Sequence, residues 1–218
     1  MTFWELRPLE IVYIDRSSRG FSMAGNSYCF HKLTPESFYW LGWMATDGCL
    51  IKSKDGWLIK LVLKESDKAC VERFAKFIGA KPPRQRKKCG SWETRVLNNV
   101  MGARLIELGI TQRKSKTLLV AEELTRSPYF WRGAFEGDGG YYETPEGNLQ
   151  LALTSYSRGF LEQLRGFYGY YDITPNNKSW KAQNYCGNAR RLLRKLYDGT
   201  YPTLALERKQ TLVHKWVR

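Results

Sequence analysis

The sequence predicts an α+β protein built from two similar halves, and three observations support this fold class. Two nine-residue segments match each other, WLGWMATDG at residues 40–48 and WRGAFEGDG at residues 131–139. The same order of predicted helices and strands follows each segment. The acids near the ends of these segments, Asp47 and Asp138, lie 91 residues apart in a chain of 218 residues. A repeat of this length divides the chain into two equivalent parts, which predicts a pseudo-two-fold arrangement.

The first half is predicted to begin with a buried helix. Thr34, Pro35 and Glu36 supply an N-cap, a proline at the first helical position and an acid in the first turn. The residues that follow are apolar on nearly all sides, which is typical of a buried helix, and Gly48 is expected to end it in a left-handed conformation. Strands are then expected at 49–53 and 58–64, a helix at 67–78, strands at 84–88 and 92–96, and a helix at 99–108.

The second half is predicted to repeat this order. Ser127 and Pro128 cap and start a helix that ends at Asp138. Strands are expected at 140–143 and 148–154, a helix at 158–168, a strand pair near 178–185 and a helix at 188–197. The chain is therefore divided into an N-terminal extension and two αββαββα halves, with predicted boundaries at 1–33, 34–122 and 123–218.

The composition indicates a nucleic-acid partner. Lys and Arg number 35 against 21 Asp and Glu, and the formal net charge of +14 favours binding to a polyanion. Hydrophobic residues make up 43% of the chain, which is enough for a core and argues against a disordered basic tail. We expect no membrane segment, because no run of about 18 apolar residues occurs. The first residues lack the pattern of a secretory signal, so an intracellular location with access to DNA is expected.

The residue types present limit the chemistry that the chain can perform. It has two histidines, His31 and His214, which argues against a histidine-ligated metal nuclease or a Ser-His-Asp enzyme. Its five cysteines are scattered and form no C-x-x-C pair, which predicts reduced thiols rather than a disulfide framework or a zinc site. Catalysis is therefore expected to depend on carboxylates and lysines.

Small residues recur at matching positions of the two repeated segments. Gly42 and Thr46 lie four residues apart on one predicted helix face, as do Gly133 and Gly137 on the other helix. Glycine within a helix costs about 1 kcal/mol relative to alanine, so a repeated pair indicates a structural need. A stripe of small residues lets two helices approach closely. The simpler interpretation, an ordinary helix before an Asp-Gly hairpin turn, does not explain the duplication.

The paired segments resemble the LAGLIDADG motif of the homing endonucleases, in the monomeric form that carries two motifs on a single chain. The glycine falls at the third motif position and the acid at the eighth, and the resemblance extends over residues 34–218. Ala45 replaces the acid expected at the sixth position, and Arg132 stands where a small residue is common. The resemblance implies a saddle-shaped antiparallel DNA-binding sheet with the two motif helices packed at its centre.

The same resemblance implies an enzyme that cuts DNA. The expected activity is a metal-dependent, staggered double-strand break in a long, non-palindromic target, made by phosphodiester hydrolysis. Asp47 and Asp138 would each serve one strand and bind Mg²⁺, or another divalent metal such as Mn²⁺, with the backbone carbonyls of Thr46 and Gly137.

Lysines that polarise the attacking water are expected near the closing segment of each half. Lys116 and Lys209 are the candidates for this catalytic role. Lys114 and Arg208 lie beside them, and the two segments align without a lysine-to-lysine match. Contact with DNA phosphates is the alternative use of these side chains.

Strand alternation predicts which side chains face DNA. Ile59, Leu61 and Leu63 fall on one face of a strand, so the opposite face is expected to meet the duplex. The predicted surface is cationic in the first half and richer in neutral polar residues in the second, which suits a non-palindromic target. The predicted DNA contacts are Lys52, Lys54, Lys60, Lys64, Arg84, Arg86, Lys88 and Arg95, followed by Tyr142, Gln150, Thr154, Lys178, Lys181 and Gln183.

Two other functions share this scaffold. A maturase would bind intron RNA and assist splicing, and a regulator would bind DNA without cutting it. Retention of both acids favours the enzyme, because a protein that only binds DNA has no need of carboxylates near phosphates. An intein is not expected, since the sequence has neither a Cys or Ser at position 1 nor a terminal His-Asn pair.

Overall fold

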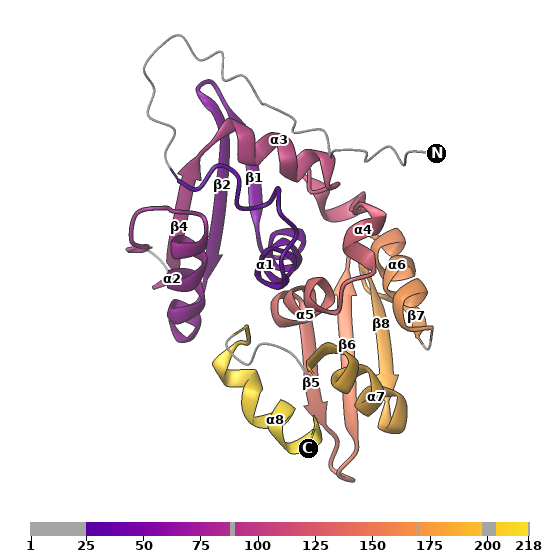
Figure 1. The fold of residues 1–218 in the computed structure, drawn as a ribbon. Coiled ribbons are helices and arrows are strands. Elements are labelled where there is room, and N and C mark those ends of the chain that lie inside the picture. Colours follow the sequence, from indigo (N-terminus) through magenta and orange to yellow (C-terminus); the bar gives the residue numbers. More distant parts are fainter. Residues whose placement is uncertain (1–24, 88–89, 170, 198–203, 218) are drawn as a thin grey trace, which may run out of the picture.

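A computed structural model of the chain describes residues 25–87, 90–169, 171–197 and 204–217. Two helices lie side by side at the centre of the molecule, and a four-stranded antiparallel sheet flanks them on each side (Figure 1). The predicted α+β fold with two repeats is confirmed, and each repeat contributes its own sheet. Within the described residues, no helix combines the length and the apolar character needed to cross a membrane.

The central helices are α1 (Pro35–Ala45) and α5 (Pro128–Gly137). Each begins where its cap predicts, since the Thr34 side chain accepts from the Ser37 backbone N–H and the Ser127 side chain accepts from that of Phe130. Gly48 has no positive φ, contrary to expectation. A Cβ at Gly48 would instead lie 2.5 Å from the Cα of Met44, so glycine is needed there for space.

The first sheet follows α1 directly. Its strands are β1 (Cys49–Ser53), β2 (Gly56–Leu63), β3 (Arg84–Gln85) and β4 (Trp92–Leu97), in the spatial order β1-β2-β4-β3. The 3₁₀ turn η1 (Glu65–Asp67) leads into α2 (Lys68–Phe77), and α3 (Asn99–Glu107) follows β4. The positions that face these helices, among them Ile59 and Leu61, are buried.

The second sheet has the same topology, β5-β6-β8-β7. Its strands are β5 (Gly139–Glu143), β6 (Leu149–Ser155), β7 (Asp172–Asn176) and β8 (Ser179–Tyr185), and its helices are α6 (Arg158–Tyr168) and α7 (Cys186–Tyr197). The predicted strand pair near 178–185 proves to be one strand, paired with a partner that begins at Asp172. Pro175 obscured that partner, because proline is tolerated in a strand chiefly at the edge of a sheet.

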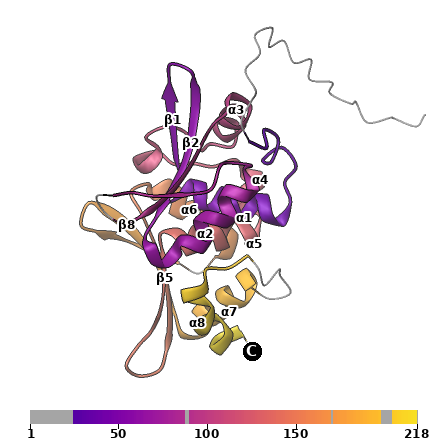
Figure 2. The ribbon, with the colours of Figure 1, turned by 90° about the vertical axis from the view of Figure 1, so that its left-hand side faces the viewer.

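Three further elements were not predicted. These are the 3₁₀ turn η2 (Lys114–Lys116), the short helix α4 (Glu122–Thr125) and the C-terminal helix α8 (Glu207–Val217). Helix α8 lies beside the central helices, next to β5 and α7 (Figures 1 and 2). The spacing of Leu206, Val213 and Trp216 carries a helical signal for α8, with Leu206 and Val213 buried.

One hydrophobic core runs through both halves. Trp40, Trp43 and Trp131 are among its largest fully buried side chains. Of the predicted N-terminal extension, residues 25–33 are described, and Phe30 packs into this core. Residues 1–24 lie outside the described part of the chain.

Candidate active site

The two central helices touch through their backbones. A Cβ at Gly42 would lie 2.1 Å from the carbonyl oxygen of Phe130, and one at Gly133 would lie 2.0 Å from that of Tyr39. Because neither oxygen belongs to a movable side chain, no residue larger than glycine fits at either position without separating the helices. The structure thus brings both predicted contact glycines to the crossing point of α1 and α5.

This close contact also brings the two motif acids together. A Cβ at Gly137 would lie 2.2 Å from the Thr46 Oγ1 and 2.9 Å from the Asp47 Oδ2. The Thr46 hydroxyl is held by hydrogen bonds to the carbonyls of Gly42 and Trp43, each at 3.2 Å. The carboxylate of Asp47 therefore lies over the last turn of the opposite helix, next to Asp138, which caps that helix.

The surroundings of both acids raise the pKa of their carboxyl groups. Asp47 and Asp138 reach solvent, and Asp138 lines a pocket of about 260 Å³ with Lys114 and Thr154. The protein around Asp138 raises the pKa of this carboxyl to about 6, first by removing solvent and second through the negative charge of Asp47. Desolvation also raises the pKa of Asp47, although the ammonium groups of Lys209 and Lys114 oppose the shift.

Lys209 holds the turn that presents Asp138. Its Nζ donates to the carbonyls of Phe135, Glu136 and Gly139, at 2.7, 2.9 and 2.8 Å. A lysine ammonium has three N–H donors, so all of them are used on backbone groups at the end of α5. A cation at this place also stabilises the negative end of the helix dipole. Burial lowers the pKa of Lys209 to about 8.

In the first half, the structure places Lys114 rather than Lys116 beside the motif acid. The Lys114 Nζ donates to the carbonyls of Thr46 and Gly48, at 3.2 and 2.6 Å. Lys116 is exposed at the other end of η2, so the catalytic expectation for it is revised. The reason is local: Arg113 adopts a left-handed conformation with φ 56°, which starts the 3₁₀ turn and directs its first residue inward.

The oxygen atoms at this place suit a hard divalent cation. Among the described residues, no group of three or more His, Cys, Asp or Glu side chains gathers as a metal site built from side chains alone would require. Asp47 and Asp138 nevertheless form a pair of carboxylates, and a bound cation would offset the repulsion that Asp47 exerts on Asp138. Thr46, whose carbonyl was predicted as a metal ligand, lines the same pocket as Asp138, and this carbonyl accepts a hydrogen bond from Lys114.

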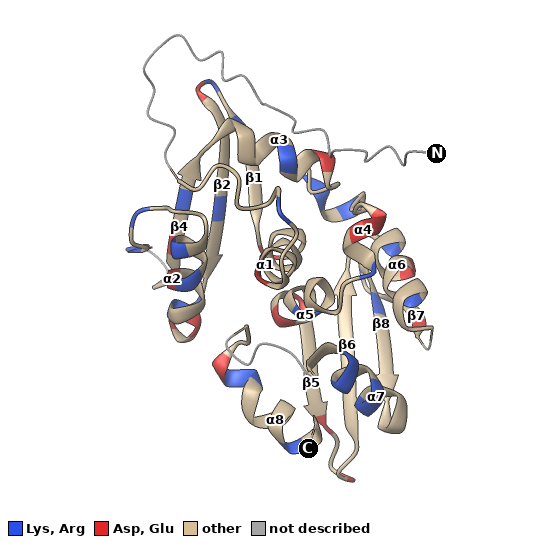
Figure 3. Cartoon of the chain, in the orientation of Figure 1, with Lys and Arg blue, Asp and Glu red and all other residues tan. Residues whose placement is uncertain are grey.

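The exposed face of the first sheet gathers four of the predicted cations. Lys60 and Arg95 are directly opposite each other on β2 and β4, as are Arg84 and Glu93 on β3 and β4. The Glu93 carboxylate lies 2.9 Å from an Arg84 guanidinium nitrogen and 3.9 Å from those of Arg86 and Arg95. One buried acid therefore orders three arginines on this surface, and Figure 3 shows the resulting positive charge on β2 and β4.

Other predicted contacts of the first half lie elsewhere. Lys52 pairs with Trp57, which places it on the opposite face from Lys60, contrary to prediction. The cause is the two-residue turn at 54–55, which fixes a register that the sequence pattern alone did not specify. Lys54 lies in this turn and Lys64 directly follows β2. Lys88 lies outside the described residues.

The exposed face of the second sheet is more neutral. Tyr142, Gln150 and Tyr185 form one row across β5, β6 and β8, and Thr154 pairs with Lys181 in another. Gln183 falls on the same face, between these two rows, whereas Lys178 is exposed in the turn between β7 and β8. Tyr185 was not predicted as a DNA contact, although it lies two residues after Gln183 and four after Lys181, a spacing that places all three on one face of a strand.

A buried polar network under the second motif was also missed. The Glu136 carboxylate is fully buried and accepts hydrogen bonds from the hydroxyls of Tyr39 and Tyr197, each at 2.6 Å. Burial raises the pKa of Glu136, and the two tyrosine hydrogen bonds oppose the shift. Arg132 is equally buried and donates to the carbonyls of Leu196 and Leu204. Arg132 was visible in the sequence as a departure from the motif, and Glu136 as the acid that Ala45 replaces in the first half, but the partners of these two residues were not visible.

Comparison with known proteins identifies the fold. No protein-family model and no curated protein matches the chain. Among solved structures, the LAGLIDADG meganuclease I-AabMI bound to uncleaved DNA is similar with a TM-score of 0.59 and 14% identity, over 84% of this chain and 91% of that one. The homing endonuclease I-WcaI bound to its DNA recognition sequence has a TM-score of 0.57 and 16% identity, over 81% and 88%.

The meganuclease I-SmaMI bound to uncleavable DNA is a third similar structure. It has a TM-score of 0.54 and 14% identity, over 85% of this chain and 88% of that one. Because each alignment covers more than 80% of this chain, it includes residues of both halves. The chain therefore has the fold of the LAGLIDADG homing endonucleases, with both motifs on one polypeptide.

Proposed function

We propose that the chain is a site-specific DNA endonuclease that makes a staggered double-strand break in a long, non-palindromic target. The observation that carries this proposal is the meeting of Asp47 and Asp138 at the ends of two helices in backbone contact. Two sheets with exposed polar faces flank this pair, and the Lys and Arg residues of the first sheet suit the negative charge of a duplex. I-WcaI and I-AabMI, which share the fold, are described as bound to DNA.

The difference between the two sheets supports a non-palindromic target. The first sheet presents Lys60 and an arginine cluster, which neutralise phosphates or donate to guanine. The second presents Gln150 and Gln183, whose amides match adenine in the major groove. Each half, 34–122 and 123–218, would thus read a different half-site, and a single chain would suffice.

The proposed reaction is hydrolysis of one phosphodiester in each strand. A water oxygen loses a proton and forms a bond to phosphorus, the bond from phosphorus to the leaving deoxyribose oxygen breaks, and that oxygen takes up a proton. Divalent cations, held by Asp47 with the Thr46 carbonyl and by Asp138 with the Gly137 carbonyl, would supply charge neutralisation and a more acidic water for each strand. I-SmaMI has been solved with its uncleaved DNA target in the presence of calcium ions, which supports a divalent cation here.

The lysines differ in what they can contribute to this reaction. Lys209 is fully engaged with three carbonyls, so we assign it to fixing the turn at Asp138. Lys114 makes two hydrogen bonds to described residues, so one of its three N–H donors remains for a water or a phosphate oxygen. It lines the same pocket as Asp138, where such a contact is within reach.

The test is a target search followed by cleavage. Randomised duplex DNA is selected for binding to the purified protein in Ca²⁺, and the selected pool is then incubated with Mg²⁺, with Mn²⁺ or with a chelator. We expect cleavage within one asymmetric sequence, in both strands and only with metal. Selection of one sequence without cleavage under any of these metals would favour the non-cutting regulator, and selection of a structured RNA instead would favour the maturase.

A further inference from the structure

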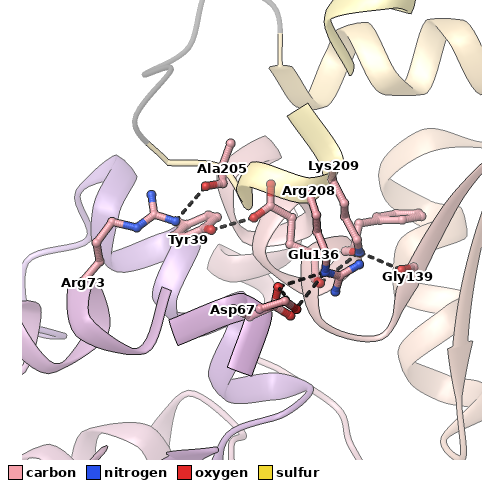
Figure 4. A network of polar contacts seen from close by, with 10 residues as sticks. Tyr39, Asp67, Arg73, Glu136, Gly139, Ala205, Arg208 and Lys209 are labelled. Atoms are coloured by element: carbon pink, nitrogen blue, oxygen red, sulfur yellow. Dashed lines mark hydrogen bonds and ion pairs between the residues drawn. The ribbon is translucent and has the colours of Figure 1, made fainter. Parts of the chain in front are cut away.

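Helix α8, which carries Lys209, is attached to the opposite half of the molecule. The Arg208 Nε donates to both carboxylate oxygens of Asp67, at 3.0 and 3.2 Å, and the Arg73 Nη2 donates to the carbonyl of Ala205 at 2.7 Å. Asp67 and Arg73 belong to the start and the body of α2, in the first half. Figure 4 shows that Arg208 reaches across to Asp67 while its neighbour Lys209 points to Gly139.

The segment that follows Lys114 is attached in the reciprocal way. The Ser157 hydroxyl donates to the carbonyl of Leu118 at 2.8 Å. The Gln163 side-chain amide makes two hydrogen bonds with the backbone of Val120, at 3.1 and 2.8 Å. Ser157 and Gln163 cap and line α6, which belongs to the second half.

These anchoring residues occupy equivalent positions in the two halves. Asp67 precedes α2 as Ser157 precedes α6, and Arg73 and Gln163 each follow six residues later, so both pairs lie 90 residues apart. The same two positions of a duplicated helix thus hold the lysine-bearing segment of the other half. An accidental contact on one side would not be expected to recur at matching positions on the other.

The two anchors differ in chemistry. Asp67 is only 4% exposed, and its carboxylate is paired with the guanidinium of the partly exposed Arg208, so Lys209 is held through an ion pair with a buried acid. Ser157, Gln163 and their partners are uncharged, so the segment of Lys114 is held by neutral hydrogen bonds. A buried carboxylate that loses its cation is strongly unfavourable, so the anchor at Asp67 is the more sensitive to mutation.

We propose that each half positions the lysine of the other half's active site. Asp67, Arg208 and Arg73 act as positioning residues for Lys209 and hence for the turn at Asp138, and Ser157 and Gln163 do so for Lys114 beside Asp47. The proposal rests on the proposed function in one respect, namely that each acid serves one DNA strand. It makes correct docking of the two halves a condition for cutting either strand.

The first experiment measures cleavage of each strand separately. Asp47→Asn and Asp138→Asn identify which end-labelled strand depends on which acid. Asp67→Asn should then slow cleavage of the Asp138-dependent strand by about tenfold while changing the other strand less than about twofold, because a small misplacement of a catalytic group has a large effect on rate. Gln163→Leu should reverse this selectivity. The control is Glu72→Gln, which removes an exposed ion pair with Lys68 on the same helix.

A second experiment tests the anchor without reference to cleavage. Lys209 is 7% exposed and Lys215 lies exposed on the same helix, so an amine-modifying reagent followed by mass spectrometry distinguishes them. Asp67→Asn should raise modification of Lys209 by about fivefold and leave Lys114 and Lys215 unchanged, since it releases only the start of α8.

The outcomes separate this proposal from the proposed function. Failure of the wild-type protein to cut any DNA would contradict the proposed function, and the modification of Lys209 would still test the anchor. Equal slowing of both strands in Asp67→Asn, or unchanged protection of Lys209 in this variant, would overturn the proposal.

Discussion

The two halves use the same motif helix with different support beneath it. At the sixth motif position the first half has the small apolar Ala45, whereas the second has Glu136 bound by Tyr39 and Tyr197. At the second position Leu41 packs in the core, whereas Arg132 bonds the carbonyls of Leu196 and Leu204. The glycine contact and the acids are equivalent in both halves. The two halves therefore share the residues of the helix crossing and the two carboxylates, and they differ in the core residues that pack beneath them.

The two halves also differ in the contacts that hold the segment at the end of each half. In the second half, Arg132 inside the core donates to the carbonyl of Leu204 in the backbone that leads to α8. The neighbouring Glu136 accepts a hydrogen bond from Tyr39, which belongs to the first half. In the first half, the segment after Lys114 is held by hydrogen bonds with Ser157 and Gln163. The second site thus depends on a buried polar network, and the first on neutral hydrogen bonds with α6 and its N-cap.

The largest effect is expected from variants of the helix crossing, which the two halves share. Gly42→Ala and Gly133→Ala each place a Cβ against a backbone oxygen, so each should lower the free energy of unfolding by about 3 kcal/mol, and by similar amounts. Urea denaturation measures this. Gly166→Ala in α6 is the control, because a Cβ there meets no atom within 4 Å of the described chain, and it should raise stability by up to about 1 kcal/mol. A large difference between Gly42→Ala and Gly133→Ala would contradict the symmetry of the crossing.

The next effect tests the polar network of the second half. Glu136→Ala leaves two buried tyrosine hydroxyls without their acceptor, so it should lower the free energy of unfolding by about 2–3 kcal/mol. Tyr39→Phe removes one donor and should cost about 1 kcal/mol. Ala45→Gly at the equivalent position of the first half is the comparison, and its cost should not exceed about 1 kcal/mol. Equal destabilisation by Glu136→Ala and Ala45→Gly would show that the network contributes nothing.

A smaller effect distinguishes the two DNA-facing sheets. Lys60→Ala should lower the slope of the logarithm of the binding constant against the logarithm of salt concentration by about one. Gln150→Ala should leave this slope unchanged and relax base preference at one position of the target. Fluorescence anisotropy at several salt concentrations measures both. Lys52→Ala, on the opposite face of the first sheet, is the control and should alter neither quantity.

The parts of the fold that depend on local sequence were predictable. The starts of α1 and α5 follow from Thr34 and Ser127, whose side chains cap the helix that begins beside them. The contact at Gly42 and Gly133 was predictable because both copies of the repeated segment have a glycine at the same helical position. The position of Lys52 was not, since the face of a residue depends on a register that the hairpin turn sets.

The supports of the site depend on residues distant in sequence. Asp67 and Arg208 are 141 residues apart, and no periodicity or spacing connects them. Arg132 stood out as a departure from the motif, whereas Glu136 stands where the motif expects an acid, and neither observation indicates a partner or burial. Lys114 could not be distinguished from Lys116 because the choice depends on the left-handed backbone at Arg113.

The most direct test of the account is the cleavage of each strand by variants of the two motif acids. Asp47→Asn and Asp138→Asn keep the shape of the side chain and remove its charge, and Asp55→Asn in the exposed β1–β2 turn is the matched control. On the selected DNA with Mg²⁺, we predict that each motif variant binds the target but fails to make a double-strand break, whereas the control cuts both strands. Complete double-strand cleavage by either motif variant would contradict the assignment of these carboxylates.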